Sequence, residues 1–204
     1  IFLISVCPRA FASVVGTMSP GTQSNPATRP PRSWVPRNFV RNFMNGSSKI
    51  LLTGGTGLLG REVSNLLRDS SELHLLMRGK GAAPERSNTV CHQLDFSEDW
   101  KADSLPSKID AVIHLAQSEH FREFPSKATN IFRVNVESTA RLLDYAYRAG
   151  ARHFVYASSG GVYGYGHQAF KENAPVVDCG KLGYYLSSKY SSELLVQQYS
   201  SLMQ

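Results

Sequence analysis

Short apolar runs alternate with helical patterns through most of the chain. Five runs have the length and composition of buried strands, at 50–53, 73–77, 89–94, 111–115 and 153–157. Apolar residues recur with a helical period over 57–69, 128–149 and about 184–202. Parallel strands buried on both faces give continuous apolar runs, and helices connect them. The pattern therefore predicts an α/β fold with a doubly wound parallel sheet.

The last predicted helix is followed by no further strand pattern. A doubly wound sheet of about six strands needs at least one more strand after a helix in this position. The 204 residues are also too few for a second domain of full size. We therefore expect residues 49–204 to form one incomplete domain, truncated before a C-terminal part that binds the substrate.

Residues 1–48 show neither period and contain six of the ten prolines of the chain. This composition predicts a disordered or non-native extension, with Met44 as a candidate start of the natural protein. Five arginines without any acidic residue are also typical of an organelle transit peptide, so that alternative stays open.

The net charge of +6 belongs mainly to this N-terminal segment. The rest of the chain carries 17 basic and 16 acidic side chains, which disfavours a nucleic-acid-binding function. Three widely spaced cysteines (Cys7, Cys91 and Cys179) predict reduced thiols in a cytoplasmic protein, with no metal site. No apolar stretch is long enough for a membrane span.

A glycine-rich turn, Thr53–Gly60, joins the first predicted strand to the first helix. Gly54 permits a tight turn, Gly57 lets a phosphate approach the backbone, and Gly60 lets the helix pack against the strand. Free N–H groups at the start of the helix attract anions. The G-x-x-G-x-x-G spacing predicts a Rossmann-like site for a dinucleotide pyrophosphate, although glycine turns also occur for steric reasons alone.

Two further patterns carry candidate chemistry. Tyr185 and Lys189 are four residues apart on one helix face, where an ammonium group would lower the pKa of the phenol. Such pairs are also common on helix surfaces, and Tyr184 lacks a lysine partner at this spacing. The segment Ser158–Gly164 follows a buried strand, where a serine can donate to a reacting oxygen or simply form a turn.

These motifs, taken in order, resemble the extended short-chain dehydrogenase/reductase family, the NAD(P)-dependent epimerase/dehydratase group. The resemblance covers Lys49 to the C-terminus and includes Asp95, His114-Leu115-Ala116 and Asn135-Val136. It implies that Tyr185 exchanges a proton with the substrate, that Ser159 rather than Ser158 is the catalytic hydroxyl, and that Lys189 holds the nicotinamide ribose.

The resemblance also implies a set of cofactor contacts. Asp95 is expected at the adenine and Ala116 near the phosphates, while His114 is expected to be structural. For Asn135, packing is an alternative to cofactor contact. The full set of expected cofactor-binding residues is Gly54, Thr56, Gly57, Leu58, Leu59, Gly60, Arg78, Asp95, Phe96, Leu115, Ala116, Asn135, Tyr185 and Lys189.

Two departures from the family pattern bear on the reaction. The second strand ends in Met77-Arg78 without the carboxylate that binds the ribose of NAD, and Arg78 could meet a 2′-phosphate instead. This favours NADP(H), unless Arg78 is only a solvated loop residue. In related dehydratases an Asp-Glu pair follows the catalytic hydroxyl. Gly160-Gly161 stands there in this chain, which disfavours elimination of water.

We therefore expect an NAD(P)-dependent epimerase or oxidoreductase that transfers a hydride at a hydroxyl or carbonyl carbon, with a nucleotide sugar as the substrate. The alternatives are a reductase of a small carbonyl compound and a non-catalytic NAD(P)-binding protein. The resemblance also implies a homodimer through the helices that contain 128–149 and Tyr185.

Overall fold

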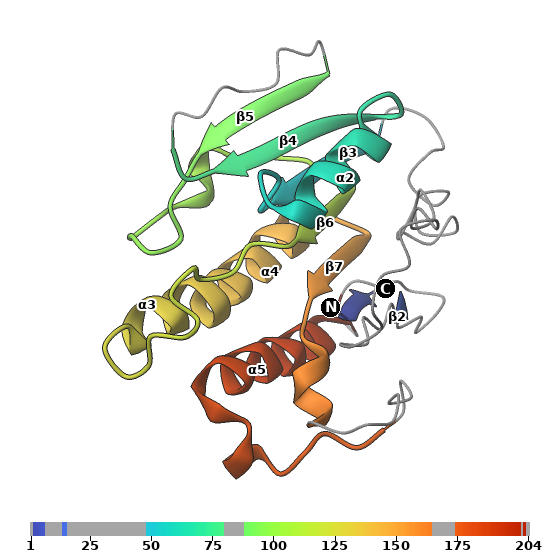
Figure 1. The fold of residues 1–204 in the computed structure, drawn as a ribbon. Coiled ribbons are helices and arrows are strands. Elements are labelled where there is room, and N and C mark those ends of the chain that lie inside the picture. Colours follow the sequence, from blue (N-terminus) through green and yellow to red (C-terminus); the bar gives the residue numbers. More distant parts are fainter. Residues whose placement is uncertain are drawn as a thin grey trace, which may run out of the picture.

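The computed structural model describes residues 2–6, 14–15, 48–79, 88–164, 174–200 and 202. Its strands and main helices follow one another as β1 (Phe2–Val6), β2 (Val14–Val15), β3 (Ser48–Thr53), α2 (Leu58–Leu67), β4 (Ser71–Met77), β5 (Thr89–Gln93), β6 (Ala111–His114), α3 (Ala128–Phe132), α4 (Ser138–Arg148), β7 (His153–Ala157) and α5 (Gly183–Ser200) (Figure 1). A π-helical turn, η2 (Arg133–Glu137), joins α3 to α4. The 3-10 helices are η1 (Ala102–Ser104), η3 (Gly160–Tyr163) and η4 (Cys179–Lys181).

The parallel part of the sheet confirms the predicted fold class. Strands β3 to β7 pair in parallel in the order β5-β4-β3-β6-β7. The chain first extends the sheet outward from β3 to β5 and then returns to the other side of β3. The direction in which successive strands are added to the sheet thus reverses between β3 and β6. Ligands of such sheets bind beyond the carboxyl ends of the strands at this point.

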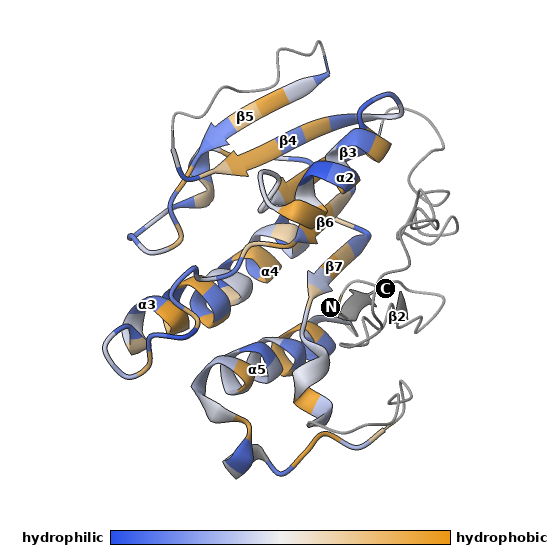
Figure 2. Cartoon of the chain, in the orientation of Figure 1, coloured by the Kyte–Doolittle hydropathy of each residue, from blue (hydrophilic) through white to orange (hydrophobic). Residues whose placement is uncertain are grey.

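Side chains alternate between two buried layers, one on each face of the sheet. On one face, Ile50 and Leu52 of β3 pack with Val63 and Leu67 of α2. On the other face, Leu51 packs in a cluster with residues of α4 and α5. Figure 2 shows hydrophobic residues along β4 and β6, whereas α2 carries hydrophilic and hydrophobic residues side by side. The sheet is therefore covered by helices on both faces and leaves its carboxyl edge for a site.

The N-terminal segment differs from the expectation of disorder at two places. Phe2–Val6 forms β1, which pairs antiparallel with β7, and Val14–Val15 forms β2 beside it. The sequence Phe2-Leu3-Ile4-Ser5-Val6 is apolar enough to form a strand, and β7 offers it an unpaired parallel-sheet edge. The rest of 1–47, including Met44 and Cys7, lies outside the described residues, and the boundary at residue 49 stays a prediction.

The predicted elements differ from the observed ones mainly at one helix. The periodicity over 128–149 predicts a single long helix, but the structure divides it into α3, the π-helical turn η2 and α4. Among the described residues, none of the helices combines the length and hydrophobicity of a bilayer span.

Candidate cofactor and active site

The glycine-rich turn has no room for side chains at two of its positions. Gly54 has a φ of 69°, and a Cβ there would lie 2.7 Å from the backbone nitrogen of Ala116. A Cβ on Gly60 would lie 2.1 Å from the carbonyl oxygen of Gly54. The N–H of Gly57 donates to the same oxygen at 3.0 Å and closes the turn. Close packing of strand β3, helix α2 and the segment after β6 therefore requires these glycines.

Helix α2 begins at Leu58 and presents unsatisfied backbone donors to the sheet edge. Its N-cap residue is Gly57, and no side chain caps the helix. The first N–H groups of a helix have no intrahelical acceptor and carry a partial positive charge. Leu58 and Leu59 can contribute only these N–H groups, since neither side chain lines the cavity described next and Leu58 is 83% exposed. The turn fits a pyrophosphate.

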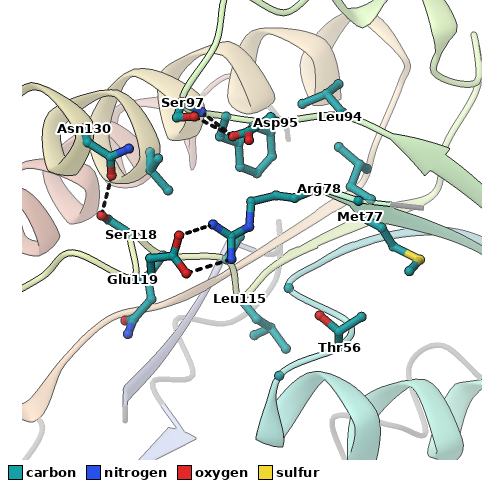
Figure 3. Close-up of a pocket in the computed structure, with 18 residues that line it drawn as sticks. Thr56, Met77, Arg78, Leu94, Asp95, Ser97, Leu115, Ser118, Glu119 and Asn130 are labelled. Carbon is teal, nitrogen blue, oxygen red and sulfur yellow. Dashed lines mark hydrogen bonds and ion pairs between the residues drawn. The ribbon is translucent and has the colours of Figure 1, made fainter. Parts of the chain in front are cut away.

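A cavity of about 470 Å³ opens at the carboxyl edge, over the switch point of the sheet (Figure 3). Eight of the predicted cofactor residues line it: Gly54, Thr56, Gly57, Arg78, Asp95, Phe96, Leu115 and Ala116. Gly60, Leu58, Leu59, Asn135, Tyr185 and Lys189 are not part of this lining. The structure thus brings together residues of four sequence motifs in one cavity.

Several polar side chains of the cavity are partnered with one another. Arg78 donates to both carboxylate oxygens of Glu119, at 2.7 and 3.1 Å. The Asp95 carboxylate accepts the backbone N–H and the hydroxyl of Ser97, both at 2.8 Å. Both contacts use Oδ1 of Asp95. Its Oδ2 can therefore accept a hydrogen bond from a ligand while Oδ1 holds the loop.

Ser159 and Tyr185 lie together in a second hollow of about 500 Å³. Its lining includes the aromatic side chains of Phe121, Phe124 and Tyr184. The Tyr185 hydroxyl donates to Oε1 of Gln117 at 2.8 Å, and Gln117 also lines the first cavity. Gln117 therefore connects the two hollows.

The serine pair after β7 separates into two roles. Ser159 caps η3 by accepting the Gly161 N–H and stays at the surface of the second hollow. Ser158 is buried, and its hydroxyl donates to the carboxylate of Glu193 on α5. The geometry agrees with the choice of Ser159 as the catalytic candidate, whose role stays a prediction.

Lys189 does not make the contact that its spacing from Tyr185 predicts. Its side chain is 2% exposed, and its Nζ lies 4.5 Å from the centre of the Tyr156 ring. Burial lowers the pKa of Lys189 to about 7, although the charge of Glu193 acts in the opposite direction. Burial also raises the pKa of Tyr185. The pKa of Tyr185 is therefore raised by burial rather than lowered by the ammonium group.

His114 lies in the core, in agreement with the structural role expected for it. It is fully buried, and burial lowers its pKa to about 3, so the ring is neutral. The Thr139 hydroxyl donates its proton to the Asn135 carbonyl oxygen, so the neutral His114 ring donates from Nε2 and accepts at Nδ1. Nδ1 accepts from Thr53 Oγ1 at 2.7 Å, and this oxygen accepts the Ala116 N–H at 3.1 Å. His114 Nε2 then donates to Thr139 Oγ1 at 3.0 Å. This chain of hydrogen bonds ties the glycine turn to helix α4.

Asn135 holds three elements together rather than lining the cavity. Its Oδ1 accepts the backbone N–H of Ser118 at 2.9 Å, and its Nδ2 donates to the Ser188 hydroxyl at 2.9 Å. Its carbonyl oxygen accepts hydroxyls from Thr139 and Ser192, at 2.6 and 2.9 Å. The packing alternative for Asn135 is therefore the one that these contacts support.

Three residues of the sites were missed by the sequence patterns. Gln117 and Glu119 follow the carboxyl end of β6, where ligand contacts concentrate in parallel sheets, so their position alone is a usable signal. Glu193 lies four residues after Lys189 on the same helix face, a spacing that also could have been used.

The switch-point cavity and its glycine turn have the architecture of the dinucleotide site in doubly wound α/β folds. The chain belongs to the NAD dependent epimerase/dehydratase family, whose model matches residues 50–204. This match confirms the resemblance inferred from the ordered motifs.

Similar proteins include nucleotide-sugar enzymes. The dTDP-D-glucose 4,6-dehydratase of Mus musculus is 28% identical over 187 residues, which cover 85% of this chain and 50% of the mouse protein. A solved UDP-N-acetylglucosamine 4-epimerase from Methanobrevibacter ruminantium has a TM-score of 0.63 at 19% identity, over 76% of this chain and 51% of its own. A short-chain dehydrogenase/reductase superfamily protein from Agrobacterium tumefaciens, with bound NAD, has a TM-score of 0.59 at 30% identity, over 74% and 44%. The chain spans about half the length of these proteins.

Proposed function

We propose that this chain is the cofactor-binding part of an NAD(P)-dependent nucleotide-sugar epimerase or oxidoreductase. The observation that carries the proposal is the pair of connected hollows at the carboxyl edge of the sheet. One is built around the glycine turn, and the other contains Ser159 and Tyr185. Gln117 links them through its hydrogen bond to Tyr185. A dinucleotide in the first hollow would therefore extend toward the candidate catalytic groups in the second.

The residues present fit a nicotinamide dinucleotide. Gly54 and Gly60 close a turn that no side chain could occupy, and Gly57 leaves the uncapped start of α2 accessible to phosphates. When bound, the nicotinamide accepts a hydride from a substrate carbon or returns it. Tyr185 would take the proton of the substrate hydroxyl during oxidation and give it back during reduction. Ser159 would donate a hydrogen bond to the same oxygen.

Epimerisation fits the site better than elimination of water does. Elimination in related dehydratases uses acidic residues directly after the catalytic hydroxyl, where Gly160 and Gly161 stand in this chain. A Cβ on Gly161 would lie only 2.9 Å from a methyl group of Leu186. An acidic side chain at position 161 would therefore require Leu186 to move. The proposed reaction is reversible redox at one carbon, although the mouse relative is a dehydratase.

The experiment that tests this function uses the full chain with NAD(P)⁺ and a panel of UDP- and dTDP-sugars. We expect reduced nicotinamide or an epimerised sugar, detected by absorbance and NMR, and loss of both in Tyr185→Phe. If the cofactor binds but no sugar of the panel reacts, the epimerase proposal is wrong.

A non-catalytic NAD(P)-binding function is the second candidate. The specific observation in its favour is that Lys189 is buried against Tyr156 while Tyr185 donates to Gln117 and has a raised pKa. Cofactor binding without turnover of any sugar in the panel would support it. Turnover that depends on Tyr185 would contradict it. A reductase of small carbonyl compounds has no observation of its own in the structure.

Further proposals concern the cofactor, assembly and location. Arg78 lines the cavity, where a guanidinium can pair with a 2′-phosphate, and we keep NADP(H) as a proposed cofactor beside NAD(H). Exposed Phe132 at the end of α3 and exposed Leu194 on α5 support a homodimer through α3 and α5. Sedimentation-equilibrium ultracentrifugation tests this directly. A cytoplasmic location remains the proposal that the cysteine pattern supports, and imaging of the tagged natural protein tests it.

A further inference from the structure

An ion pair crosses the cofactor cavity between two strands that are not neighbours. Arg78 follows the end of β4, and Glu119 follows the end of β6. Strand β3 lies between β4 and β6, so the pair passes over the end of β3, where the glycine turn begins. Figure 3 shows the guanidinium and the carboxylate facing each other across the cavity, with two parallel hydrogen bonds.

The pair is poorly placed to serve stability. The side chains of Arg78 and Glu119 are 61% and 57% exposed, and ion pairs in such positions contribute little to folding. Both residues nevertheless line the cavity. The pair is therefore expected to affect ligand binding in the cavity more than the folding stability of the chain.

Arg78 stands where doubly wound folds distinguish NAD from NADP. An acidic residue after the second strand binds the ribose 2′-hydroxyl of NAD, whereas an arginine nearby accommodates the 2′-phosphate of NADP. A guanidinium binds carboxylate and phosphate with the same paired geometry. In this chain the pairing face of Arg78 is taken by Glu119, and Glu119 holds the pKa of Arg78 above its ordinary value.

We propose that Glu119 is a specificity-determining residue that restrains NADP(H) binding by competing with the 2′-phosphate for Arg78. The inference rests on the proposed dinucleotide binding. A 2′-phosphate must displace the Glu119 carboxylate before it can pair with Arg78, and the carboxylate then repels it. NAD(H) meets neither obstacle, because its ribose carries a hydroxyl at this position. The contribution of Arg78 to NADP(H) affinity is therefore held down by a residue from a different loop.

The test is a double-mutant cycle read by equilibrium binding. The full chain is titrated with NADH and NADPH, followed by nicotinamide fluorescence, as wild type, Glu119→Gln, Arg78→Met and the double variant. In Glu119→Gln we expect NADPH affinity to rise relative to NADH affinity by about fivefold, the upper range for an exposed ion pair. In Arg78→Met the ratio falls, and Glu119→Gln then raises it by less than it does in the wild-type background.

Glu123→Gln is the matched control. Glu123 is an exposed carboxylate four residues further along the same loop, it pairs with His120 at 2.8 Å, and it does not line the cavity. Its replacement removes the same charge and should leave the NADPH/NADH ratio unchanged. Thermal melts should show that all variants fold, since each changed side chain is exposed.

The outcomes separate the two claims. If neither cofactor binds the wild-type chain, the proposed function fails first. If both bind and Glu119→Gln leaves their ratio unchanged, the inference about Glu119 is wrong. It is also wrong if Glu119→Gln raises the ratio equally in the Arg78→Met background, because the effect would then be general electrostatic repulsion rather than competition for Arg78.

Discussion

At the scale of single residues, burial decides which of the candidate catalytic side chains a ligand can reach. Tyr185 is reachable from the second hollow, whereas Lys189 is enclosed beside Tyr156. The spacing of Tyr185 and Lys189 predicted a shared helix face but not how deeply each side chain lies. Depth depends on strand β7, which brings Tyr156 over the helix from a distant part of the sequence.

The enclosed lysine predicts a stability that depends on pH. The pKa of Lys189 is about 7 in the folded chain, so above this pH the folded chain holds fewer protons than the unfolded chain, in which the lysine stays charged. Stability therefore rises with pH through this window, by roughly 2 kcal/mol between about pH 7 and about pH 9. Urea unfolding at these two pH values measures the rise. It should disappear in Lys189→Met, and an equal rise in that variant would contradict the assignment.

Substitution of the turn glycines should lower the stability of the chain. Gly60→Ala places a methyl group against the Gly54 carbonyl, and Gly54→Ala adds an unfavourable φ to a clash with Ala116. We expect each change to destabilise the chain by about 1–3 kcal/mol, as overpacking and backbone strain do. Gly79→Ala is the control, because its Cβ would meet nothing within 4 Å. Chemical denaturation gives the comparison, and equal stability of Gly60→Ala and Gly79→Ala would contradict the packing argument.

At the scale of elements, the sequence predicted what depends on local pattern. Strands β3, β4, β6 and β7 were predicted because each contains an apolar run that the sheet buries, whereas β5 is an edge strand whose residues are half-buried or exposed. The π-helical turn at 133–137 was not predicted, since one wider turn leaves the apolar period of the flanking helices almost unchanged. The pairing of Arg78 with Glu119 was also missed, because it depends on the order of strands in the sheet rather than on distance along the chain.

Asn135 allows a test of the element scale. Asn135→Ala leaves the Ser118 N–H and the Ser188 hydroxyl without their shared partner at a buried position. We expect a loss of about 1–3 kcal/mol, the cost of unsatisfied buried polar groups. Asn65→Ala, on the exposed side of α2, should change stability little. A small effect of both substitutions in denaturation experiments would show that Asn135 does not join the three elements.

At the scale of the whole molecule, the fold gathers distant residues at one edge. The turn after β3, Arg78 after β4, Asp95 after β5 and Glu119 after β6 all meet in one cavity, although they span more than sixty positions of sequence. Parallel strand direction alone brings them there. The family match agrees with a cofactor site at this edge. The substrate remains a proposal because the chain spans about half the length of its relatives.

The central claim is that the glycine-lined cavity binds a nicotinamide dinucleotide, and a fluorescence titration of the full chain with NADH tests it most directly. Gly57→Val should block binding without unfolding the chain, since the φ of Gly57 is −73° and its Cβ would approach only the Gly54 oxygen, at 3.3 Å. Leu58→Ala, outside the cavity, is the matched control. We predict saturable binding by the wild type and Leu58→Ala and none by a folded Gly57→Val. No binding by the wild type, or equal binding by Gly57→Val, would contradict the account.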